Sequence, residues 1–121
     1  MIRLSIDRYA KLAWFIGDGV VRLDDVKEVL EKFYVDRPTP KTIWDFTGAD
    51  LSEATLDQVE ELVNFVKERS PRKNGRNAFV ASDPFIYTLG QMYRIFAELA
   101  DQTIRTKIFR TRSEAEEWLR D

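Results

Sequence analysis

The stretch that decides the fold runs from Thr42 to Thr55 and reads TIWDFTGADLSEAT. Its first part, Thr42 to Phe46, is mostly apolar and predicts a buried strand. The polar residues that follow predict a loop, and the capping-box pattern from Thr55 to Gln58 predicts the start of a helix. In an open α/β sheet, the loop that leaves the carboxyl end of such a strand is the usual place for ligands and partners.

The other segments predict strands and helices that pack around this unit. Apolar periodicity predicts strands over 2–6, 12–16, 77–81 and 104–109, and helices over 23–33, 56–66, 85–99 and 115–119. The order ββαβαβαβα predicts a mixed, mostly parallel five-stranded sheet with four helices, whose first strand is an antiparallel edge. At 121 residues the chain is expected to form one domain over 1–121. Five large residues are expected in one core: Trp14, Ile43, Phe79, Phe96 and Trp118.

The amino-acid composition limits the kinds of chemistry and partner that are expected of this protein. The chain has no cysteine and no histidine, which argues against disulfides, thiolate nucleophiles and the usual zinc ligands, so we expect no metal and no cofactor. The 19 basic and 21 acidic residues give a net charge of −2, which does not favour nucleic-acid binding. The sequence has no apolar run of about 20 residues and no signal-peptide pattern at its start, so a cytoplasmic location is expected.

Two polar segments invite a functional interpretation. Gly17-Asp18-Gly19 contains a glycine pair but lacks the spacing of a phosphate-binding loop, and we interpret it as a tight turn. A basic cluster near the end of the second helix could contact phosphate groups, yet it lacks interleaved aromatic residues, so we interpret it as a solvated loop. The cluster consists of Arg69, Arg72, Lys73 and Arg76.

The carboxylates of the central stretch are Asp45, Asp50 and Glu53. Such a group could perform acid–base chemistry or bind a divalent ion. We favour a structural role, in which Asp45 accepts N–H bonds from the loop while Asp50 and Ser52 shape its turns. A receiver-type phosphoacceptor is disfavoured, because it requires an acidic pair after the first strand and a lysine before proline on the last. Here Asp18 stands alone and Lys107 is followed by Ile108.

Over nearly its whole length the chain resembles the STAS domain family, in particular the SpoIIAA-like branch related to anti-sigma-factor antagonists. The resemblance rests on the element order, on the segment WDFTG at 44–48, and on the ending KIFR at 107–110 followed by SEAEEWL at 113–119. It implies a non-catalytic protein-interaction module. The partner surface that it implies comprises Asp45, Thr47, Gly48, Asp50, Ser52, Glu53 and Thr55.

Phosphorylation-switched members of that family carry Asp-Ser-Ser at the start of the helix after the central strand. Here the corresponding residues are Glu53, Ala54 and Thr55, so alanine replaces the first serine. Thr55 and the nearby Ser52 are the remaining candidate phosphoacceptors. We therefore predict a constitutive, non-phosphorylated binder.

Three functions follow from these observations, in order of preference. The first is a regulatory interaction module that binds another protein as a monomer or weak homodimer. The second is a binder of a small anion or a lipid, because STAS-like domains share an architecture with CRAL-TRIO lipid-transfer domains and helix N-termini hold anions. The third is a carboxylate-dependent enzyme. We expect the protein not to be an enzyme.

Overall fold

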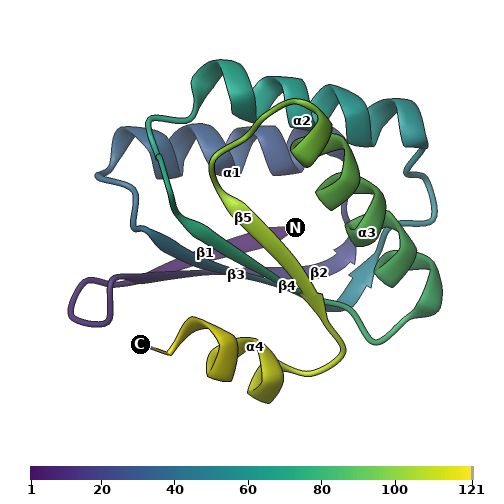
Figure 1. Ribbon diagram of the computed structural model, residues 1–121. Helices are drawn as coiled ribbons and strands as arrows, with labels where there is room; N and C mark the ends of the chain where they lie inside the picture. The colour runs from purple at the N-terminus through teal and green to yellow at the C-terminus, as the bar shows by residue number, and fades with distance from the viewer. Residues whose placement is uncertain (121) are drawn as a thin grey trace.

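The computed structural model describes residues 1–120 and has the predicted ββαβαβαβα order (Figure 1). The strands are β1 (Ile2–Asp7), β2 (Leu12–Val20), β3 (Lys41–Asp50), β4 (Arg76–Val80) and β5 (Arg105–Phe109). The helices are α1 (Leu23–Val35), α2 (Leu56–Arg69), α3 (Pro84–Leu99) and α4 (Arg112–Leu119). Within residues 1–120, no helix is long and apolar enough to cross a membrane.

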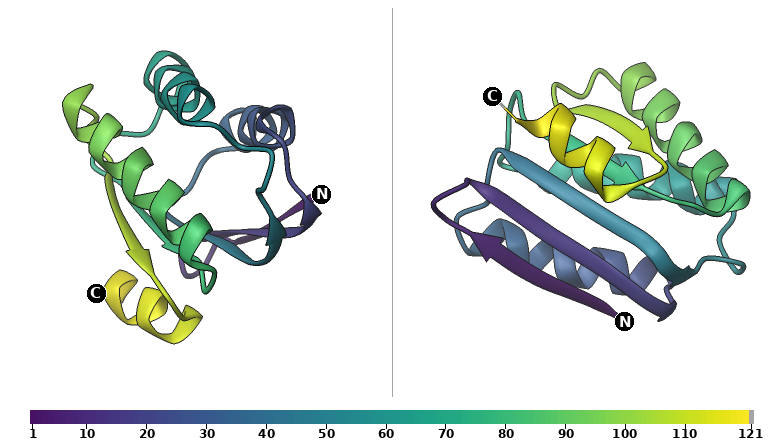
Figure 2. Two further views of the ribbon diagram at one scale, coloured as in Figure 1. Left: turned by 90° about the vertical axis from the view of Figure 1, so that its right-hand side faces the viewer. Right: turned by 90° about the horizontal axis from the view of Figure 1, so that it is seen from below.

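The five strands form one sheet in the order β1-β2-β3-β4-β5. β1 pairs with β2 in antiparallel fashion, and the other three pairs are parallel, as predicted. Helices α1, α2 and α3 cover one face of this sheet and α4 lies on the other (Figures 1 and 2). The protein is therefore a three-layer α/β domain, with three helices in one outer layer and one helix in the other.

The two central strands extend further than the sequence indicated. The predicted turn at Gly17-Asp18-Gly19 is wrong, because these residues belong to β2. The polar residues 47–50, expected in a loop, continue β3 and pair with the end of β2, after a β-bulge between Ile16 and Asp18. The predicted loop thus shrinks to residues 51–55.

Glycine makes this extension possible. A Cβ atom at Gly17 would lie only 2.5 Å from Cδ1 of Phe46, so the bare backbone admits the phenyl ring against the strand. Gly19 has φ +66, a left-handed conformation that glycine adopts without strain. The two glycines therefore fit a bulged strand end as well as they would fit a turn.

Side chains cap the starts of α2, α3 and α4. Thr55 Oγ1 accepts a hydrogen bond from the Gln58 amide and Gln58 Oε1 accepts one from the Thr55 amide, both at 3.2 Å, which confirms the capping box. Asp83 caps α3 ahead of Pro84. At Thr111 only half of a capping box forms: Thr111 Oγ1 accepts from the Glu114 amide, but Glu114 Oε1 accepts from the Thr111 hydroxyl and not from its amide.

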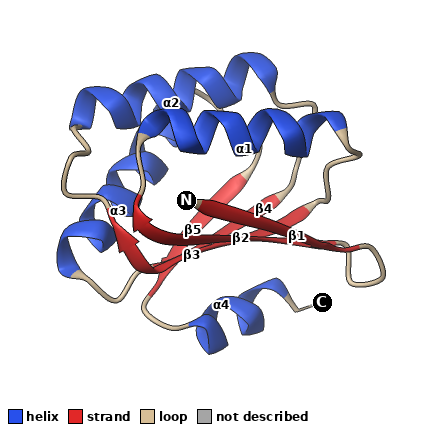
Figure 3. Ribbon diagram, turned by 180° about the vertical axis from the view of Figure 1, so that it is seen from behind, coloured by secondary structure: helices blue, strands red, loops and turns tan. Residues whose placement is uncertain are grey.

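The sheet divides the apolar interior, so the prediction of one core is wrong. Trp14, Ile43 and Trp118 form a cluster with Ala78, Val80, Ala115 and Leu119 on the sheet face that α4 covers. Figure 3 shows α4 on this face, across the sheet from the other helices. Phe79 lies on the opposite face, against the cluster beneath α1 and α2, and Phe96 packs in a smaller cluster between α2 and α3. Successive side chains of a strand point to opposite faces of the sheet, so large residues on the strands can belong to different cores.

Candidate functional site

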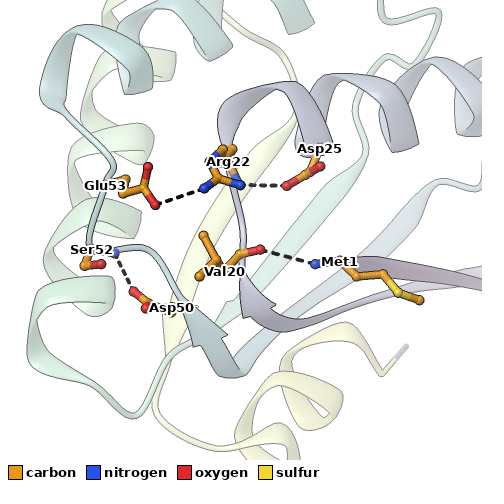
Figure 4. A network of polar contacts seen from close by, with 7 residues as sticks. All are labelled: Met1, Val20, Arg22, Asp25, Asp50, Ser52 and Glu53. Atoms are coloured by element: carbon orange, nitrogen blue, oxygen red, sulfur yellow. Dashed lines mark hydrogen bonds and ion pairs between the residues drawn. The ribbon is translucent and has the colours of Figure 1, made fainter.

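The loop from Leu51 to Thr55 joins β3 to α2 at the carboxyl ends of the parallel strands (Figure 4). Asp50 Oδ1 accepts a hydrogen bond from the Ser52 amide at 2.8 Å. Hydrogen bonds from the side chain and backbone of Ser52 lower the pKa of Asp50. Ala54 donates to the Leu51 carbonyl, which closes a turn. The predicted turn-shaping role of Asp50 and Ser52 is confirmed.

An ion pair connects this loop to the start of α1. Arg22 Nη2 lies 3.3 Å from Glu53 Oε2, and both side chains are more than half exposed. The Arg22 amide also donates to Asp25 Oδ2 at 2.9 Å, which holds the first turn of α1 (Figure 4). Solvent-exposed ion pairs typically contribute only about 0–1 kcal/mol. The contact between Arg22 and Glu53 can therefore open at little cost.

Asp45 is a buried residue in the middle of β3. It is 4% exposed, and its Oδ1 accepts hydrogen bonds from the Thr47 amide at 3.0 Å and the Thr47 hydroxyl at 2.7 Å. Its Oδ2 lies 3.4 Å from Nε of Arg112 at the start of α4. The predicted acceptance of a backbone N–H by Asp45 is confirmed. Since it is buried, Asp45 is not available at the surface with the other six predicted partner-binding residues, which are all exposed.

The structure does not gather the three carboxylates into one site. Asp45 pairs with Arg112, Asp50 with Ser52 and Glu53 with Arg22. In the described part of the chain, no three side chains of the metal-binding types come together in a way that could hold an ion. The two candidate phosphoacceptors, Ser52 and Thr55, are exposed, and the Thr55 oxygen already serves as a helix cap.

A cavity of about 280 Å³ lies between the sheet and helices α1 and α2. Most of its wall is apolar and aromatic, with contributions from the sheet, α1, α2 and α3; among these residues are Phe15, Leu30, Trp44, Val59, Leu62 and Phe79. Arg22, Glu53, Ala54 and Gln58 also line it, so part of the loop before α2 forms the rim of the cavity. Of the seven residues predicted as a partner surface, Glu53 alone lines it.

The opposite end of the cavity is polar. Thr42 and Asn77, paired across β3 and β4, face it together with Arg72, Tyr34 and Tyr93. Asn77 Oδ1 accepts hydrogen bonds from the Thr42 hydroxyl and from Arg72 Nη1. The cavity therefore has an exposed, charged mouth at one end and a buried polar group at the other.

The sequence patterns did not predict the polar end of the cavity. The interpretation of the basic cluster as a solvated loop is wrong for Arg72, which reaches the cavity, and for Arg76, which donates to the Trp118 carbonyl at 2.9 Å. One signal was present: Thr42 and Asn77 are polar residues at the starts of two strands that are otherwise buried. Buried polar groups need partners, so this pair pointed to an internal polar site.

Comparison with known proteins does not assign the chain to a group. No protein-family model matches it, and no curated protein matches it. The resemblance to STAS domains therefore rests on the motifs and the element order, and the functional argument rests on the geometry of the site.

Proposed function

We propose that this protein binds a small apolar or amphipathic molecule in the cavity between the sheet and helices α1 and α2. The observation that carries the proposal is the cavity itself, at about 280 Å³. Small-molecule sites typically measure roughly 300–1,000 Å³ and are mostly apolar with a few polar groups. An apolar cavity of about 150 Å³ already binds benzene. The space thus suits a ligand of about ten non-hydrogen atoms.

An empty cavity of this size would be costly. In enclosed cores, unfilled apolar volume destabilises a protein by about 24 cal/mol per Å³. The wall of this cavity is mostly apolar, so much of its lining gains little from contact with water. Native interiors otherwise contain few voids larger than a water molecule. A sequence that leaves such a volume unfilled is best explained by a ligand that fills it.

The mouth of the cavity supports reversible binding. The exposed ion pair between Arg22 and Glu53 bridges α1 and the loop, and both residues line the cavity. Opening this contact would widen the path to the apolar interior without breaking a buried interaction. Interaction with another protein through the same loop, expected from the resemblance, stays a prediction. If both functions hold, a partner at the loop would contact the rim of the ligand site.

The carboxylates support binding without catalysis. Asp45 is buried with Thr47 and Arg112, and Asp50 is engaged with Ser52, so neither is directed into the cavity. Glu53 lies at the rim and carries a cationic partner. The acidic residues that line the cavity, Asp24 and Glu53, lie at its mouth, and we assign them a role in access to the cavity.

A series of straight-chain alcohols tests the proposal with neutral ligands. We expect affinity, measured by isothermal titration calorimetry, to rise about fourfold for each added carbon, because burying one methylene contributes about 0.8 kcal/mol. The rise should stop near ten carbon atoms, when the cavity is full. The series from hexanol to dodecanol covers this range. Absence of saturable binding across the series, or affinity that increases without limit, would contradict a bounded apolar site.

A further inference from the structure

The polar end of the cavity contains an unusual cation. Arg72 follows α2, and its guanidinium carbon lies 5.6 Å from the centre of the Phe33 ring. Nη1 donates to Asn77 Oδ1 at 3.0 Å and Nη2 to the Pro40 carbonyl at 2.9 Å. Nε is buried and has no hydrogen-bond partner. Nη1 and Nη2 each donate to one neutral acceptor and carry a second N–H group, while Nε is enclosed by protein atoms.

The charge of Arg72 has no acidic counterpart. Over residues 1–120, no carboxylate lies within ion-pairing distance of its guanidinium. Burial lowers the pKa of Arg72 to about 10, although neighbouring Tyr34 and Tyr93 oppose the shift. Burial raises the pKa of both tyrosines. At neutral pH a charged guanidinium therefore faces two uncharged phenols, and burying an unpaired charge is expensive.

Arg72 lies at the end of the cavity opposite its mouth, and the distance between the two ends limits the length of a ligand. The mouth lies near Leu23 at the first turn of α1 and the polar end near Tyr34 at its last, both of which line the cavity. The eleven steps along the helix from Leu23 to Tyr34, at about 1.5 Å each, span about 17 Å. The wall between the two ends is mostly apolar. A ligand that satisfies both regions carries one anionic group and an apolar chain.

Resting on the ligand-binding function proposed above, we propose that the ligand is a monocarboxylic acid with a chain of about ten carbon atoms, bound with its carboxylate at Arg72. A carboxylate supplies the negative charge that the guanidinium lacks, and its oxygens can accept from the second N–H of Nη1 or Nη2; charge-assisted hydrogen bonds are the stronger kind. Among the described residues that line the cavity, Arg72 is the only cation at this end, so a doubly charged phosphate monoester would remain partly uncompensated. The apolar chain then runs toward the mouth at Arg22 and Glu53.

Decanoate and 1-decanol, which share a chain length and differ in head group, test the proposal at pH 8. We expect wild-type protein to bind decanoate at least tenfold more tightly than decanol in calorimetric titrations. Arg72→Gln should remove this preference and leave decanol affinity within about threefold of wild type. Arg72→Lys, which keeps the charge and guards against loss of folding in the glutamine variant, should retain part of the preference.

Arg22→Gln is the matched control, because it removes a cation from the other end of the cavity. It should keep the preference for decanoate. Equal binding of the two ligands by wild type, a preference that survives Arg72→Gln, or one that disappears in Arg22→Gln would overturn the carboxylate assignment and leave the apolar site in place. Failure of both ligands to bind wild type would instead overturn the proposed function itself.

Discussion

Phe15→Ala is expected to lower the free energy of unfolding by about 3–5 kcal/mol. Phe15 is 0% exposed at the centre of β2. Its ring stacks on Trp44 with centroids 3.9 Å apart and meets Phe33 of α1 edge-on at 5.2 Å. Removing the ring would break the contact between the sheet and α1. It would also enlarge the existing cavity, which Phe15 lines, and larger residual cavities increase the loss.

Urea denaturation followed by circular dichroism measures this loss. Tyr9→Ala serves as the control, because Tyr9 is 99% exposed and its removal should change stability by less than about 0.5 kcal/mol. A loss below about 1.5 kcal/mol for Phe15→Ala would mean that the ring is not enclosed between β2, β3 and α1. The packing that forms the wall of the cavity would then be incorrect.

Val59→Phe is expected to weaken the binding of 1-decanol by about 100-fold or more. Val59 lies in the second turn of α2 and lines the cavity. A phenyl ring at this position would occupy space that the chain of the ligand needs. Excluding about four methylene groups costs about 3 kcal/mol, which corresponds to roughly 200-fold in affinity. Filling a void should leave stability unchanged or raise it.

Asn64→Phe provides the matched control for this substitution. It introduces the same ring on the exposed side of α2, away from the cavity, and should leave decanol affinity unchanged. Titration calorimetry and thermal unfolding of both variants give the two quantities needed. Undiminished binding by a folded Val59→Phe protein would place the ligand elsewhere.

Local sequence patterns were sufficient for the order of elements and for several details of the site. The apolar stretch from Thr42 to Phe46 marked the central strand, and Thr55 with Gln58 marked the start of α2, because both signals depend on nearby residues. The roles of Asp45 and Asp50 followed from the ordinary behaviour of carboxylates beside a turn. The full length of β2 did not follow, because Gly17 and Gly19 suit a turn equally well until β3 is placed beside them.

The cavity could not be predicted, because it depends on distances between elements that are far apart in the sequence. Residues such as Leu30 and Leu62 have the spacing of ordinary core residues on amphipathic helices. Whether their side chains meet or enclose space is decided by how α1 and α2 sit over the sheet. Arg72 was hidden in the same way, since its neighbours Phe33 and Asn77 come from another helix and from the following strand.

Contacts between bound 1-decanol and the protein test the central claim most directly. Isotope-filtered nuclear Overhauser spectra, recorded with ¹³C-labelled protein and unlabelled ligand, identify the methyl groups next to the chain. The account predicts contacts to Leu30 and Leu62, which line the cavity from α1 and α2, and none to Leu12 on the α4 face of the sheet. Contacts to Leu12 without contacts to Leu30 and Leu62 would contradict it.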